Sequence, residues 1–162
     1  MKHAIFTVCI VLVSGILALG TAAPDFSGNW IRDAAKSDSM ATYVDGKVTP
    51  INVNLVVRQQ ANNLQVESIW GNKPSTQISY VLDGNEHTFT DERGGSLTYQ
   101  ATMKGDQLVI EGYKKASTPF GTAEIKTKEE WLLSADGRTL TITTTTATSS
   151  FGEQTRKQIY TK

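Results

Sequence analysis

The chain has 162 residues, with 16 basic and 16 acidic side chains, two histidines and one cysteine. These balanced and scattered charges exclude the basic face that binds nucleic acid, and also a polybasic segment that would hold the chain on a membrane surface. A single cysteine excludes a framework of internal disulfides.

Residues 1–22 have the layout of a secretory signal peptide. A short basic start precedes the apolar run Ala4–Leu19, and small residues follow it. The run is shorter than the roughly 20 apolar residues of a transmembrane helix, and Pro24 favours cleavage after Ala22. We therefore expect a secreted or periplasmic protein that does not span a membrane.

Residues 23–162 are expected to form a single domain. Cys9 lies in the segment that cleavage removes, so core packing alone must hold the domain together. About 140 residues suffice for one domain that buries roughly two-thirds of its unfolded surface.

Alternation of apolar and polar residues runs through this domain and predicts antiparallel strands. In the sequence INVNLVV, for example, Ile51, Val53, Leu55 and Val57 share one face. Pairs of Asn, Asp and Gly, which tolerate the positive φ of tight turns, separate the runs. In the longest irregular stretch, between the first two strands, only residues 33–40 have a pattern that fits a helical turn. The expected strands are at about 26–32, 51–60, 64–70, 76–82, 86–91, 96–104, 107–115, 122–134, 138–147 and 154–161.

A series of hairpins of this kind predicts an all-β fold, an antiparallel up-and-down β-barrel of eight to ten strands. Closure of the barrel removes exposed strand edges. An immunoglobulin-like sandwich would need long crossing connections, and the sequence shows none after Pro50. The alternate strand faces are polar, as at Gln65 and Glu67, which favours a water-soluble barrel over an outer-membrane barrel.

The first expected strand carries a Gly-x-Trp pattern, Gly28 and Trp30, in the sequence DFSGNWIRD. With the export signal and the hairpin series, this pattern resembles the lipocalins and the wider calycin superfamily. The stretches FSGNWIRDAAKSDS and EEWLLSADGRTLTIT are similar to small secreted bacterial lipocalin-like proteins. The resemblance implies that Trp30 plugs the closed end of the barrel and that a basic residue of the last strand, Arg156, packs over it.

The chain departs from the lipocalin pattern because it stops at a strand instead of a closing helix. A calycin barrel of the fatty-acid-binding type is the related alternative, since ten strands fit it, although the sequence contains no sign of that family's helical lid.

Aromatic and polar side chains share the more apolar strand faces, which point inward in a closed barrel. Aromatic side chains either fill such a core or wall an apolar cavity, and a barrel of this size is wide enough for either. An inward carboxylate needs a partner such as Arg156, or a polar group of a ligand. The candidate ligand-binding residues are Ser68, Trp70, Tyr80, Phe89, Tyr99, Glu129 and Trp131.

The resemblance and these residues favour a non-catalytic binding protein for a small, mostly apolar ligand. One alternative is a solid barrel that binds a protein partner through the loops at 40–50 or 117–121, where Phe120 follows Pro119. Another is an enzyme on a calycin barrel, using His87 and Glu129. The sequence indicates no metal ligands, cofactor or catalytic residues, because residues 23–162 contain one histidine and no nucleophile motif. The ligand and the oligomeric state stay open.

Overall fold

The computed structural model describes residues 23–44, 47–71, 75–90, 95–118, 121–148 and 152–162. The expected signal peptide at 1–22 lies outside the described residues, as do Pro119 and Phe120 of the expected contact loop.

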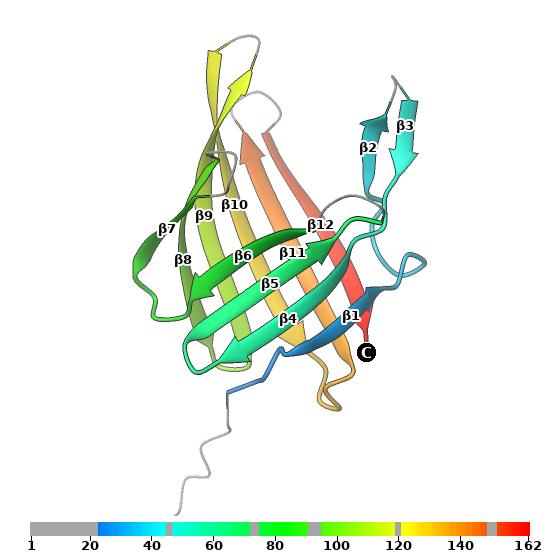
Figure 1. Ribbon diagram of the computed structural model, residues 1–162, viewed down its shortest axis with the longest axis vertical. Helices are drawn as coiled ribbons and strands as arrows, with labels where there is room; N and C mark the ends of the chain where they lie inside the picture. Colours follow the sequence, from blue (N-terminus) through cyan, green and yellow to red (C-terminus); the bar gives the residue numbers. More distant parts are fainter. Residues whose placement is uncertain (1–22, 45–46, 72–74, 91–94, 119–120, 149–151) are drawn as a thin grey trace, which may run out of the picture.

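Within these ranges the structure is all-β and contains no helix (Figure 1). The strands are β1 (Gly28–Arg32), β2 (Ala41–Val44), β3 (Lys47–Pro50), β4 (Asn54–Gln60), β5 (Asn63–Ile69), β6 (Thr76–Val81), β7 (Glu86–Thr90), β8 (Ser96–Lys104), β9 (Gln107–Thr118), β10 (Gly121–Leu133), β11 (Thr139–Thr148) and β12 (Gly152–Thr161).

Ten of the strands form one antiparallel sheet in the order β6-β5-β4-β1-β12-β11-β10-β9-β8-β7. The sheet curls around a single interior, with β4–β6 crossing over β8–β12 (Figure 1). The first strand lies between β4 and the last strand, where Trp30 is opposite Leu55 and Ile31 is opposite Thr161. The predicted barrel of eight to ten antiparallel strands is therefore confirmed.

The barrel is nearly closed, because no backbone ladder joins the two edge strands, β6 and β7. A side chain of β8 bridges this seam instead. The Tyr99 hydroxyl donates a hydrogen bond to Ser79 O of β6 at 3.2 Å and accepts one from the Val81 amide at 3.1 Å. Beside it, the Gly84 amide donates to Ala101 O at 3.0 Å. One tyrosine thus satisfies backbone groups that a neighbouring strand would otherwise pair.

The sequence did not predict β2 and β3, which pair only with each other in a separate hairpin near the upper end of the barrel (Figure 1). Before the hairpin, at the place of the expected helical turn, the chain makes one turn in which the Lys36 amide donates to Asp33 O. Met40 follows this turn, is half-buried and packs against the barrel core. The hairpin is therefore tied to the barrel through Met40.

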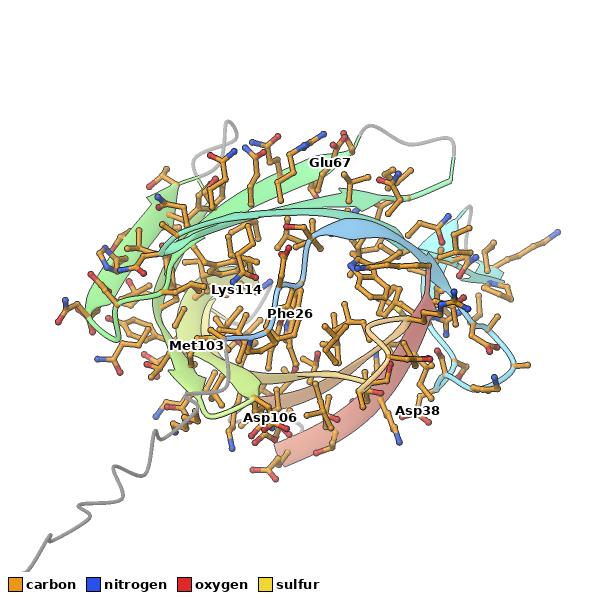
Figure 2. The ribbon with its side chains drawn as sticks, turned by 90° about the horizontal axis from the view of Figure 1, so that it is seen from below. Phe26, Asp38, Glu67, Met103, Asp106 and Lys114 are labelled. Atoms are coloured by element: carbon orange, nitrogen blue, oxygen red, sulfur yellow. The ribbon has the colours of Figure 1, made fainter. Side chains whose placement is uncertain are left out.

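The lower end of the barrel is sealed by aromatic side chains. Trp30 is 1% exposed and its Nε1 donates to Phe26 O at 2.9 Å. The Phe26 ring packs edge-on against Trp131 with centroids 6.0 Å apart. Seen from below, Phe26 lies inside the ring of strands (Figure 2). Burial of such large aromatic side chains stabilises this end of the fold.

The cation over Trp30 is Lys162 and not the predicted Arg156. Lys162 Nζ lies 4.5 Å from the centroid of the Trp30 ring. Tyr160 is opposite Arg32 in the β1–β12 ladder, so the residue that reaches Trp30 comes after Tyr160. Arg156 is on the same face of β12 but lies opposite Thr144 of β11, nearer the upper end. The expected kind of contact forms, but with a residue six positions further along the chain than Arg156.

Candidate functional site

The barrel interior contains a cavity of about 190 Å³ above the sealed end, called here the inner cavity. Four aromatic side chains from four strands or their ends form part of its wall: Trp70, Tyr80, Trp131 and Tyr160. Aliphatic side chains of β4, β5, β6 and β11 complete the apolar surface. The inner cavity is therefore lined mainly by groups that attract apolar molecules.

A second space of about 230 Å³, called here the mouth cavity, adjoins the first. The two share Met40, Thr144 and Gln158 in their walls. The mouth cavity is more polar, because Gln154 and Arg156 also line it. Ligand pockets usually begin at roughly 300 Å³, so the two spaces together suit a small molecule.

Glu129 brings an acidic group into the inner cavity. It is half-buried on the inner face of β10, and one carboxylate oxygen accepts a hydrogen bond from Trp131 Nε1 at 2.9 Å. Burial raises the pKa of this carboxyl, and the indole hydrogen bond lowers it by less. The described residues contain no ion pair with Glu129. In particular, the pair with Arg156 that the sequence left open does not form, since Thr144 of β11 lies between the two in the ladder.

Two tyrosines, Tyr80 and Tyr160, lie near the Glu129 carboxyl. Burial raises the pKa of Tyr160 to about 12, and the nearby charge of Arg32 lowers it by less, while Glu129 adds to the rise. Burial also raises the pKa of Tyr80 strongly, and Glu129 again contributes. Both hydroxyls therefore stay protonated. Neither has a hydrogen-bond partner among the residues that the structure describes, so both can bind a guest.

Arg32 is buried beside the cavity and was not predicted. It is 6% exposed, and its guanidinium donates to Gln158 Oε1, to Asn52 Oδ1 at 3.3 Å and to Asp38 O at 2.6 Å. Gln158, also 6% exposed, donates to the same Asp38 oxygen at 3.1 Å. All three acceptors of Arg32 are uncharged. Its position two residues after Trp30 on the same strand face was the signal that would have placed it inside.

The predicted site residues divide into three groups. Five of them line the inner cavity: Ser68, Trp70, Tyr80, Glu129 and Trp131. Tyr99 is instead the bridge across the seam, in edge-on contact with Tyr80 at 5.0 Å between centroids. Phe89 is half-buried against the core and does not line the cavity. The structure thus brings together most of the aromatic set and Glu129.

His87 lies away from Glu129. Its Nε2 is 2.9 Å from Asp83 Oδ1, and its ring packs beside Tyr99. Hydrogen bonds from the Asn85 amide and from His87 lower the pKa of Asp83 to about 2. Asp83 lies in the turn before β7 and His87 lies in β7 itself, so this pair ties the turn to the strand. The described residues bring no His, Cys, Asp or Glu cluster together at metal-binding geometry.

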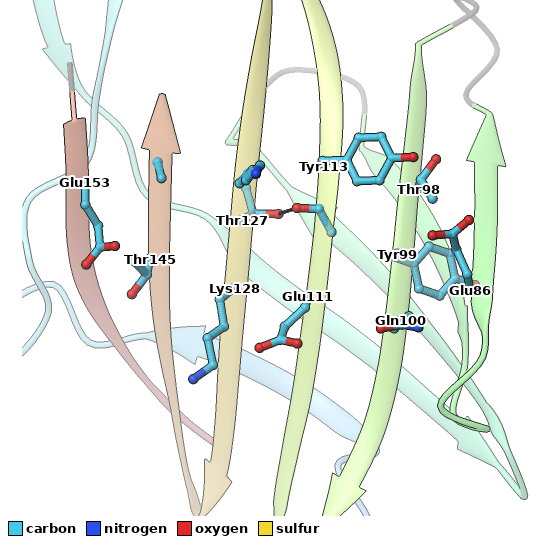
Figure 3. A pocket seen from close by; sticks show the side chains of 13 residues that line it. Glu86, Thr98, Tyr99, Gln100, Glu111, Tyr113, Thr127, Lys128, Thr145 and Glu153 are labelled. Atoms are coloured by element: carbon cyan, nitrogen blue, oxygen red, sulfur yellow. Dashed lines mark hydrogen bonds between the residues drawn. The ribbon is translucent and has the colours of Figure 1, made fainter. Parts of the chain in front are cut away.

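A larger hollow of about 420 Å³ lies on the outer face of β7–β12 (Figure 3). Charged side chains line it, including Glu111, Lys126 and Lys128. Lys128 Nζ is 3.0 Å from Glu130 on the same face. Such water-exposed charges are well screened, and the hollow is wide open. The interior cavities, with their apolar walls, are the better candidate site.

No helix in the described part of the chain is long and apolar enough to cross a membrane.

The architecture is similar to several solved structures. Zebrafish ileal bile acid-binding protein in complex with cholic acid matches with a TM-score of 0.56 and 16% identity, over 85% of this chain and 98% of that chain. Fatty-acid-binding protein 1 of Echinococcus granulosus matches with a TM-score of 0.53 and 16% identity, over 85% and 96%. Secretory abundant heat soluble protein 4 of Ramazzottius varieornatus matches with a TM-score of 0.52 and 18% identity, over 85% and 94%.

The fold is a calycin-like β-barrel. Identities this low establish the fold alone. The similar structures include a fatty-acid-binding protein, the type of barrel that the sequence offered as the alternative to a lipocalin. No protein-family model matches the sequence, and no curated protein matches it either.

Proposed function

We propose that this calycin barrel is a non-catalytic binding protein that holds a small, mostly apolar molecule in its interior. The observation that carries the proposal is the pair of adjoining cavities behind the Trp30 and Phe26 seal. Apolar walls supply affinity, and a few polar groups set the orientation of the guest.

The fold neighbours support this proposal, since one was solved with cholic acid and another is named a fatty-acid-binding protein. The two cavities inside the barrel also argue against the solid-barrel alternative, in which side chains would fill this space. The position of His87 outside the cavity argues against the enzymatic alternative, which needs converging acid and base groups.

A cavity-filling substitution tests the proposal. Ser68 lines the inner cavity, so Ser68→Phe should fill part of it and weaken binding of an apolar fluorescent probe by about tenfold or more. Its neighbour Glu67 is on the opposite strand face, so Glu67→Phe is the matched control and should bind the probe normally. Equal binding by the two variants, both folded by circular dichroism, would contradict an interior site.

We also propose that the chain is exported and that residues 1–22 are removed. The basic start, the apolar run Ala4–Leu19 and the small residues after it support this. Amino-terminal sequencing of protein recovered from its own source should begin at Ala23. A chain that still begins at Met1 would contradict the proposal.

A further inference from the structure

The inner cavity has an acidic character. Among its described lining residues Glu129 is the one charged side chain, and the other polar groups are hydroxyls and the Gln158 amide. The Tyr80 and Tyr160 hydroxyls lie close enough to Glu129 for its charge to raise the pKa of both. A carboxylate and two phenol oxygens therefore offer acceptors to the same guest.

Among the residues that the structure describes, none with a positive charge forms an ion pair with the Glu129 carboxyl. Arg32 is behind the wall, and its donors already bind Gln158, Asn52 and Asp38. Arg156 points into the mouth cavity, is solvent-exposed, and is separated from Glu129 by β11. A half-buried carboxylate that accepts one hydrogen bond but has no counter-ion is costly to desolvate. A guest of opposite charge would remove that cost.

The aromatic side chains around Glu129 add a second attraction for a cation. Trp70, Trp131, Tyr80 and Tyr160 all contribute to the wall of the inner cavity. The faces of aromatic rings attract cations, tryptophan most strongly, and the attraction grows when water is excluded. The carboxylate and the aromatic wall together favour an ammonium group in this cavity over a carboxylate.

We propose that the inner cavity takes the ammonium group of an apolar amine, with Glu129 as its counter-ion. This inference rests on the proposed function, because it concerns a guest in the same cavities. The ammonium group donates hydrogen bonds to Glu129 and to the tyrosine oxygens. The alkyl part of the guest extends along Ile142 and Met40 toward the mouth cavity. A fatty carboxylate placed in the same way would face Glu129 as a like charge.

Three probes of equal chain length test this selection: octylamine, octanol and octanoate, each measured by calorimetry at neutral pH. We expect octylamine to bind the native chain about tenfold more tightly than octanoate, as the loss of a charge-assisted hydrogen bond implies. Glu129→Gln keeps the shape of the side chain and should remove this preference. Glu130→Gln, on the outer face of the same strand, is the matched control and should keep it.

Arg156→Gln measures the effect of the charge in the mouth cavity independently of the charge of Glu129 in the inner cavity. It should leave octylamine binding unchanged or tighter, while any weak octanoate binding at the mouth should fall. The inference would be overturned if octanoate bound as tightly as octylamine. It would also be overturned if the Glu129→Gln chain kept the preference of the native chain for octylamine over octanoate. Either result would leave the proposed function intact. If none of the three probes binds, both the proposed function and the inference fail.

Discussion

Lys162 Nζ lies 4.5 Å from the centroid of the Trp30 ring, and Gly28 leaves the room for it. A β-carbon at Gly28 would come within 2.6 Å of Lys162 Cε, and the φ of this glycine is +153°. The glycine and the tryptophan of the Gly-x-Trp pattern thus act on one partner, because the first admits the lysine chain and the second binds its ammonium group.

Loss of this contact should destabilise the closed end. We expect Lys162→Ala to lower the free energy of unfolding by about 0.5–1 kcal/mol, the usual range of a cation–π contact. Gly28→Ala should cost more, and the two substitutions together should cost less than their sum, since removal of the lysine chain relieves the clash. Urea unfolding of both variants and of the double variant measures the coupling. Strict additivity would contradict the shared contact.

The seam depends on one hydroxyl group. Tyr99→Phe keeps the ring against Tyr80 but leaves the Val81 amide and Ser79 O without this partner. We expect a loss of about 1–3 kcal/mol, the cost of unsatisfied buried polar groups, and faster hydrogen exchange at Val81. Tyr113→Phe, on the exposed face of β9, is the control and should change neither quantity. Unchanged exchange at Val81 would show that the seam closes without Tyr99.

The buried guanidinium ties together segments far apart in the sequence. Arg32→Lys keeps a positive charge but loses the planar fork that reaches Gln158, Asn52 and Asp38 together. We expect a destabilisation of about 2 kcal/mol, since buried acceptors lose their donors, with increased exchange around Asp38. Arg58→Lys, on the exposed face of β4, should be nearly neutral. Equal stability of the two variants in thermal unfolding would contradict this role.

Stability should vary with pH through Glu129. Burial raises the pKa of this carboxyl above its ordinary value of 4.5, so the folded chain binds its proton more tightly than the unfolded chain does. Protonated Glu129 makes its full contribution to the free energy of unfolding at pH values below its pKa in the unfolded chain. This contribution is lost as the pH rises through its pKa in the folded chain. Glu129→Gln should therefore stabilise the chain at neutral pH, and the difference from the native chain should vanish in acid.

The groups that face Glu129 are Tyr80, Tyr160 and the Trp131 indole, with Arg32 beside Tyr160. Both tyrosines stay neutral across this window, so the carboxyl itself is the group that titrates. Unfolding of the native and Glu129→Gln chains at a series of pH values measures the effect, and a difference that is constant with pH would contradict it.

Alternation was enough to predict the barrel strands, because each has one face packed on the core and one in water. The strand at 96–104, for example, has the bounds of β8. The hairpin of β2 and β3 escaped prediction, and for β3 the reason is its exposure to solvent. All four residues of β3 are exposed, so no burial imposes an alternating pattern on it.

Alternation also gave the inward direction of Glu129 and Trp131, but not which inward groups meet. That depends on ladder register, which joins residues far apart in the chain. Arg32 and Gln158 are 126 positions apart and meet only because β1 pairs with β12. Lys162 reaches Trp30 in place of Arg156 for the same reason. The resemblance to lipocalins predicted that a cation would pack over Trp30. The register of the β1–β12 ladder determines that this cation is Lys162.

The place of β1 between β12 and β4 makes the sheet order a cyclic shift of the chain order. Read from β7, the strands follow the sequence to β12, continue at β1 and end at β6. A circular permutant that joins Lys162 to Asp25 through a short glycine linker and begins at Gly84 would therefore keep every ladder. Its β1–β12 pairing would become a local one, so the permutant should fold faster than the natural chain to the same barrel.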